Sequence, residues 1–163
     1  KAVKALFGLI MLAMAVWVSR PAWPFLVAQV QGPDAVVSAH QSALPFKRVR
    51  TVVELEEALL QARQAGQPVM LDFYADWCTS CLEMEHQTFR DTSVQSRLKA
   101  VVLLQADVTA NTEADRALLE RFQLFGPPGI IFYDAQGREL TDSRVIGYQA
   151  PVDFIASLQK AGL

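Results

Sequence analysis

The chain of 163 residues has 15 basic and 17 acidic side chains, a formal net charge of -2 and a hydrophobic share of 52%. That length suits one domain with a tail, and the apolar share is enough for a core. The balanced charge offers no basic face for nucleic acid, and no phosphate loop of the G-x-x-x-x-G-K type is present. The two cysteines, three positions apart, exclude a disulfide framework and argue against structural zinc, which usually takes four Cys or His ligands.

The N-terminal 30 residues differ from the rest of the chain. An uncharged run, ALFGLIMLAMAVWVS at 5–19, lies between Lys4 and Arg20, and aromatic residues cluster at its far end. The run is shorter than the roughly 20 residues of a full membrane span, although Lys4 could lengthen it by snorkelling. Three interpretations remain open: a membrane helix or its remnant, which we favour, a signal-peptide core, or a buried soluble helix. If the run spans a membrane, its basic start favours a cytoplasmic N-terminus and places the remainder outside the cytoplasm.

The first half of the predicted domain contains two helical patterns around a strand. Residues 31–50 show little periodicity and are interpreted as a linker or extended arm, so the domain is placed at 51–163. A capping-box pattern at Thr51-Val-Val-Glu54 predicts a helix that ends before Gly66 and Pro68. VMLDFY at 69–74 predicts a buried strand. A helix is expected over 78–89, with Leu82, His86 and Phe89 on one face, and a shorter one from 91 or 92 to about 99.

The second half continues the alternation. VVLLQA at 101–106 predicts a buried strand, a helix is expected from Thr112 to about 122, and GIIFY at 129–133 predicts a third strand. A turn at 134–137 leads to a strand near 144–146, which should pair antiparallel with 129–133. Pro151 suits the first turn of a last helix that ends before Gly162. Such alternation predicts an α/β domain with a parallel sheet covered on both faces and an antiparallel edge.

The two cysteines lie where the first buried strand meets a helix, in the segment Trp77-Cys78-Thr79-Ser80-Cys81. At this spacing on a first helical turn the sulfurs are close enough to bridge, and the helix N-terminus favours a thiolate at Cys78. We therefore expect Cys78 to attack a disulfide and Cys81 to resolve the mixed disulfide. Trp77 is expected to cover the site. A permanent structural bridge or a metal clip is the less favoured alternative.

Two carboxylates accompany this pair. Asp72 interrupts an apolar strand six residues before Cys78, and burial there would raise its pKa. It could then supply or accept the proton of Cys81, unless it is an edge carboxylate that faces water. Glu85 lies one turn beyond Cys81 and could tune both thiols, although a solvated helix charge is nearly as good an explanation. Asp76 and His86 are weaker candidates.

A proline pair precedes the third strand, in Gly126-Pro127-Pro128-Gly129. An ordinary proline turn is one explanation. Because cis bonds in proteins are concentrated at proline and a CxxC pair lies upstream, we expect a cis peptide bond at Pro128.

These segments resemble known proteins. VMLDFYADWCTSC resembles the active-site segment of thioredoxins, and GPPGIIFYD resembles their cis-proline strand. YADWCTSCLEMEHQTF, VVLLQADVTANTEADRALLERF and VIGYQAPVDF resemble the C-terminal domain of the DsbD family of thiol:disulfide interchange proteins, over about residues 47–163. The resemblance implies a thioredoxin-like fold, with a central mixed sheet flanked by helices. It also implies that the apolar N-terminal segment is a remnant of the family's membrane domain.

The resemblance further implies a function. In that family a membrane-embedded domain reduces the C-terminal domain, which then reduces a periplasmic N-terminal domain of the same protein. The final clients are disulfide isomerases and the cytochrome c maturation pathway. The chain would be a protein-disulfide reductase with no cofactor or metal, located at the bacterial inner membrane with this domain in the periplasm. A free-standing membrane-anchored thioredoxin-like protein and a non-catalytic binding module with a structural CxxC remain as alternatives.

The resemblance also assigns residues. Cys78 and Cys81 match the redox pair, Asp72 and Glu85 match two acidic positions near it, and Pro128 matches the cis-proline. The substrate-binding residues would be Trp77, Pro127 and Pro128. Pro127 departs from the family pattern, because the residue before the cis-proline usually offers a backbone N–H to the substrate and proline has none.

Overall fold

The computed structural model describes residues 43–163. The expected apolar segment at 1–30 and most of the expected linker at 31–50 lie outside the described residues. In the described part of the chain, no helix is both long and apolar enough to cross a membrane. The elements in chain order are β1 (Lys47–Val49), α3 (Val52–Gln64), β2 (Val69–Tyr74), α4 (Thr79–Glu83), η3 (Met84–Thr88), α5 (Thr92–Leu98), β3 (Val102–Asp107), α6 (Glu113–Arg121), β4 (Gly129–Tyr133), η4 (Thr141–Ser143), β5 (Val145–Ile146) and α7 (Pro151–Lys160).

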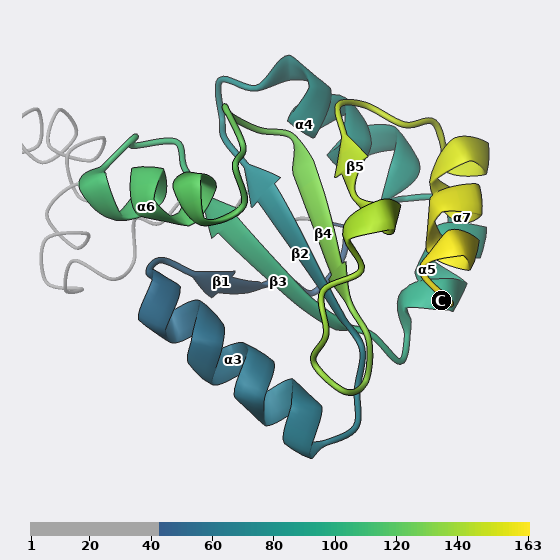
Figure 1. The fold of residues 1–163 in the computed structure, drawn as a ribbon. Coiled ribbons are helices and arrows are strands. Elements are labelled where there is room, and N and C mark those ends of the chain that lie inside the picture. The colour runs from purple at the N-terminus through teal and green to yellow at the C-terminus, as the bar shows by residue number, and fades with distance from the viewer. Residues whose placement is uncertain (1–42) are drawn as a thin grey trace, which may run out of the picture. The chain divides into compact units, whose positions relative to one another are not determined.

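The strands form one mixed sheet in the order β1-β3-β2-β4-β5 (Figure 1). Strands β1 and β2 run parallel to β3, whereas β4 is antiparallel to β2 and β5 is antiparallel to β4. The predicted mixed sheet is confirmed. Antiparallel pairing begins one strand earlier than expected, because apolar patterning reports burial and carries no information on strand direction.

Strand β1 was not predicted, and it occupies the end of the segment that was interpreted as a linker. It has only three residues, lies at the sheet edge and pairs Lys47 to Val49 with Leu104 to Ala106 of β3. Three residues are too few to show an alternating pattern, so periodicity could not reveal this strand. Its pairing ties the residues directly before α3 to β3, the second strand of the sheet.

Alternate residues of the central strands face the two covering layers. Leu71 and Phe73 of β2 pack on the side of α3 and α6, together with Leu55 and Phe122. Met70 of β2 faces the opposite side, where η3, α5 and α7 contribute the buried residues Met84, Phe89, Val94, Leu98, Phe154 and Leu158. The period of two in a strand sends successive side chains to opposite faces, and both faces of this sheet are covered. Asp72 and Gln105 therefore point into the η3 side.

Two helices begin with threonine caps. Thr51 Oγ1 accepts a hydrogen bond from Glu54 N at 3.1 Å, whereas Glu54 Oε2 accepts from Arg50 N rather than from the cap residue. The expected cap of α3 is therefore present, without the reciprocal half of a capping box. Helix α6 has the complete box, formed by Thr112 and Asp115.

The helix expected over 78–89 starts at the expected place and changes character midway. Cys78 is its N-cap, α4 covers Thr79–Glu83, and the chain then continues as the π-helix η3. The expected apolar face with His86 is wrong, because His86 is exposed while Glu85 and Thr88 are buried. A π turn adds a residue to the helical repeat, which rotates the following side chains relative to an α-helix; such turns are frequent at functional sites.

Candidate active site

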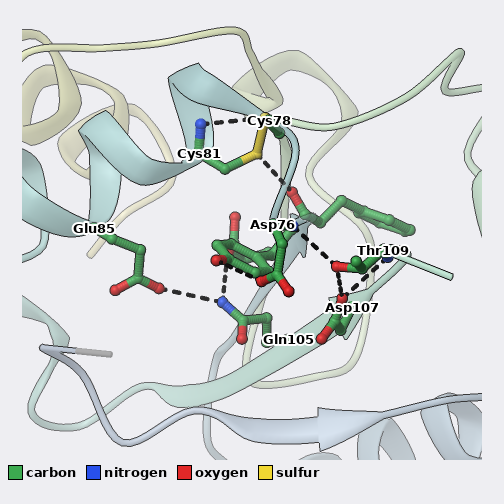
Figure 2. Close-up of a disulfide and its surroundings, with 10 residues drawn as sticks. Asp76, Cys78, Cys81, Glu85, Gln105, Asp107 and Thr109 are labelled. Carbon is green, nitrogen blue, oxygen red and sulfur yellow. Dashed lines mark hydrogen bonds between the residues drawn. A yellow bond between two sulfur atoms is a disulfide. The ribbon is translucent and has the colours of Figure 1, made fainter. Parts of the chain in front are cut away.

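The two cysteines form a disulfide at the start of α4 (Figure 2). The S–S distance is 2.09 Å and the Cα atoms are 5.3 Å apart. Cys81 N donates a hydrogen bond to Cys78 Sγ at 3.2 Å, so a backbone donor already faces the sulfur of Cys78. Such a donor, at a helix N-terminus, stabilises negative charge on a thiolate.

The sulfurs differ more in surroundings than in exposure. Cys78 is 6% exposed and Cys81 is 4% exposed. Cys81 Sγ lies 3.9 Å from the carbonyl oxygen of Phe73, inside the domain, whereas Cys78 is the N-cap at the helix start. The assignment of Cys78 as the attacking sulfur therefore rests on its place at the helix N-terminus and not on a difference in exposure.

Three buried polar side chains meet on the η3 side of the sheet. Asp72 of β2 and Gln105 of β3 are register partners on adjacent parallel strands. Gln105 Nε2 donates to Asp72 Oδ2 at 3.0 Å and to Glu85 Oε1 at 3.3 Å, and Figure 2 shows Glu85 reaching from its helix toward this amide. Asp72 is 5% and Glu85 is 7% exposed. The alternatives of an edge carboxylate for Asp72 and a solvated charge for Glu85 are therefore wrong.

Burial of Asp72 raises the pKa of its carboxyl group to about 7, from a model-peptide value of 3.8. The hydrogen bond from Gln105 acts in the opposite direction, and the nearby negative charge of Glu85 adds to the increase. Loss of hydration disfavours the ionised form of a carboxyl group. Asp72 is thus partly protonated near neutral pH and is able either to accept or to release a proton.

Sequence reasoning missed Gln105. The signal was available, since Gln105 is the polar residue within the apolar run VVLLQA. A buried polar side chain needs a hydrogen-bond partner. The partners of Gln105 come from β2 and η3, and only the strand register and the π turn bring them to it.

The proline loop lies at the end of the sheet where β2 ends and β4 begins. The expected cis bond is confirmed between Pro127 and Pro128. Gly129, the first residue of β4, is the antiparallel register partner of Phe73 near the end of β2. Pro128 therefore lies at the end of the sheet from which the chain continues from β2 to the cysteines. Gly147 N donates to Pro128 O at 3.1 Å, which holds the loop against the end of β5.

Exposed aromatic residues flank both segments. Trp77 is 60% exposed, and its Nε1 donates to Thr109 O at 3.1 Å. Phe125, two residues before Pro127, is fully exposed. Within residues 43–163 no three His, Cys, Asp or Glu side chains form a group that could hold a metal ion.

Comparisons with known proteins agree with this geometry. A family described as Thioredoxin-like matches residues 50–135. The crystal structure of the oxidised C-terminal domain of Neisseria meningitidis DsbD is 33% identical, covers 71% of this chain and 99% of its own, and has a TM-score of 0.61. The chain belongs to the DsbD family. The reduced form of the same Neisseria domain matches equally well, with 32% identity and a TM-score of 0.60.

Full-length DsbD proteins match over the same region. The thiol:disulfide interchange protein DsbD of Ralstonia nicotianae is 51% identical over 135 residues, which are 83% of this chain and 22% of that protein. DsbD of Klebsiella pneumoniae is 46% identical over 156 residues, which are 94% of this chain and 24% of that protein. The chain thus spans about a quarter or less of these relatives. The DsbD match and the CxxC disulfide identify a thiol:disulfide oxidoreductase site.

Proposed function

We propose that the chain is a protein-disulfide reductase that relays electron pairs from a membrane-embedded dithiol to periplasmic protein disulfides. The observation that carries this proposal is the Cys78–Cys81 disulfide at the start of α4. The names of the DsbD relatives support interchange chemistry. The relay direction, the membrane location and the acceptor, an N-terminal domain of the same protein, follow from family membership as inferences.

The forward reaction starts from the reduced pair. The thiolate of Cys78 attacks one sulfur of the partner disulfide, a mixed disulfide forms, and the other partner sulfur leaves as a thiolate. Cys81 then loses its proton and attacks Cys78 Sγ, which releases the second partner thiol and leaves the Cys78–Cys81 disulfide. Two electrons pass to the partner. The donor dithiol restores the reduced pair by the same exchange in reverse.

The buried carboxylates supply a place for the proton of Cys81. Cys81 Sγ lies on the inner side of the disulfide, by the carbonyl group of Phe73, and Asp72 is the residue before Phe73 on β2. Because the pKa of Asp72 is raised to about 7, its carboxylate has the proton affinity of a base suited to neutral pH. Glu85 shares the Gln105 amide with Asp72, and its negative charge raises the pKa of Asp72 further.

The reduction potential of the Cys78/Cys81 pair tests the direction of the relay. The full chain is equilibrated with dithiothreitol or glutathione buffers of defined potential, and the free thiols are counted after acid quenching. We expect a potential on the order of the thioredoxin value, about -270 mV. A potential near the value of strong periplasmic oxidants, about -120 mV, would make the chain a disulfide donor and overturn the relay. Absence of a reversible two-electron couple would support a non-catalytic module with a structural bridge.

A further inference from the structure

The loop that carries the reactive cysteine is held by residues from another strand. Residues 75–77 connect β2 to Cys78. Two of their N–H groups donate hydrogen bonds to Thr109, which lies two residues beyond the end of β3. Asp76 N donates to Thr109 Oγ1 at 2.9 Å, and Trp77 Nε1 donates to Thr109 O at 3.1 Å. Figure 2 shows Asp76, Thr109 and Asp107 grouped on one side of the disulfide. The two residues that directly precede Cys78 are thus fixed by one threonine.

The direction of the Thr109 hydroxyl is determined by its second partner. Thr109 Oγ1 donates to Asp107 Oδ1 at 2.5 Å, and Thr109 N donates to the same oxygen at 3.0 Å. An ionised carboxylate can only accept, so the hydroxyl proton is committed to Asp107. An oxygen lone pair of Thr109 is then left for the N–H of Asp76. The carboxylate of Asp107 in this way makes the threonine a fixed acceptor.

Strand β1 supplies the cation for this carboxylate. Arg48 Nη1 forms an ion pair with Asp107 Oδ2, the oxygen that Thr109 does not use. Both side chains are about one-third exposed or less, so water screens the pair only in part. The register of β1 against β3 places Arg48 opposite Gln105, two residues before Asp107. Contacts therefore run from Arg48 on β1 to Asp107 at the end of β3, and from Asp107 through Thr109 to the cysteine loop.

We propose that Thr109, oriented by Asp107 and Arg48, is a positioning residue for the sulfur of Cys78. The inference rests on the proposed exchange function and adds a residue that acts through Asp76 and Trp77. Cys78 N donates to Ala75 O at 3.0 Å, so the same short loop also sets the backbone of the cysteine. A loop released from Thr109 lets Cys78 depart from the geometry in which Cys81 N faces its sulfur. Small displacements of reacting groups lower rates strongly, because the productive orientation becomes rare.

Removal of the hydroxyl group alone tests this role. Thr109→Val keeps the branched shape of the side chain and the backbone carbonyl group that accepts from Trp77. Thr109→Ser keeps the hydroxyl group. The rate of exchange between the reduced full chain and a small aromatic disulfide is measured from pH 5 to pH 10 by release of the chromophoric thiol. We expect Thr109→Val to lower the rate about fivefold to tenfold and to move the midpoint of the pH–rate profile to higher pH, since the thiolate loses a fixed donor. Thr109→Ser should restore the rate to within about twofold of the parent chain and restore the pH midpoint.

Thr51→Val is the matched control. It removes a threonine hydroxyl group that accepts from a backbone N–H, at the start of α3 and away from the cysteines. It should lower the thermal midpoint and leave the pH–rate profile unchanged. If Thr109→Val does not fold, Asp107→Ala gives a second test, because it removes the oxygen that accepts from the Thr109 hydroxyl group and so frees that hydroxyl proton.

Each outcome is decisive. An unchanged rate and pH midpoint in Thr109→Val, with normal exchange by the parent chain, would overturn the positioning role and leave the proposed function intact. Equal effects of Thr109→Val and Thr51→Val on the pH midpoint would also overturn it, since both would then reflect stability. Absence of exchange in the parent chain itself would instead refute the proposed function.

Discussion

The amide of Gln105 donates to the carboxylate of Asp72 across two adjacent parallel strands, at 3.0 Å from Nε2 to Oδ2. The same nitrogen donates to Glu85 at 3.3 Å. One amide group thus bridges two buried carboxyl groups, and the charge of Glu85 still raises the pKa of Asp72. The electrostatics of the site therefore depend on a neutral residue that carries no titratable proton.

Gln105→Leu should raise the pKa of Asp72 above about 7, because the hydrogen bond that lowers it is lost while burial remains. The measurement is a titration of carboxyl carbon shifts by NMR in the oxidised chain with labelled aspartate. Gln95→Leu is the control, since the part-buried Gln95 of α5 donates to the backbone oxygen of Phe89 at 2.9 Å. An unchanged midpoint for Asp72 in Gln105→Leu would contradict the bridging role.

Asp72 should also make the stability of the folded chain depend on pH. With a pKa of about 7 in the folded chain and 3.8 in model peptides, the folded state binds more protons between these values. The free energy of unfolding should therefore fall as the pH rises from about 4 to about 7, by an amount on the order of a few kcal/mol, and level off above that range. Asp72→Asn should remove this fall, as followed by urea denaturation of the oxidised chain at a series of pH values. A slope that survives the substitution would assign the dependence to another group.

Asp72→Asn should also slow thiol–disulfide exchange. Without a carboxylate at position 72, Cys81 loses its proposed proton acceptor, and the pH–rate profile of the reduced chain should shift. A profile identical to that of the parent chain would remove Asp72 from the catalytic step.

The two cysteines should behave differently when replaced singly. Cys78→Ser should abolish exchange, since it removes the attacking thiolate at the helix start. Cys81→Ser should accumulate a mixed disulfide with a partner, because the resolving sulfur is missing. Non-reducing gel electrophoresis followed by mass measurement detects the trapped species. Trapping by Cys78→Ser in place of Cys81→Ser would reverse the two roles.

Phe154 anchors α7 on the η3 side of the sheet. It is fully buried, with ring centroids 5.8 Å from Phe89 and 6.4 Å from Phe132. Phe154→Ala should lower the free energy of unfolding by about 3–5 kcal/mol through lost burial and a residual cavity. Val152 on the same helix is 78% exposed, so Val152→Ala should change stability by less than about 0.5 kcal/mol. Urea denaturation compares the two, and equal effects would contradict this description of the core.

Most elements of the described domain were predictable from local patterns. The strand 129–133 was predicted with its observed bounds, the helices after Thr51 and Thr112 start where these cap residues predicted, and the last helix starts at Pro151 as its first-turn proline predicted. Cap chemistry and apolar runs are short-range signals, so a single sequence contains them. The direction of β4 and the existence of β1 were not predictable, because both depend on pairing with strands distant in sequence.

By itself the sequence determined the reactive pair, since two cysteines at this spacing before a helix start can bridge, and it determined that Asp72 lies within an apolar strand. The tertiary structure decided which groups surround them. The strand register places Gln105 beside Asp72, the π turn rotates Glu85 inward, and the end of β3 brings Thr109 to the cysteine loop. These contacts join residues 20 to 33 positions apart. Register and helix rotation arise from packing of the whole domain, and no local pattern encodes them.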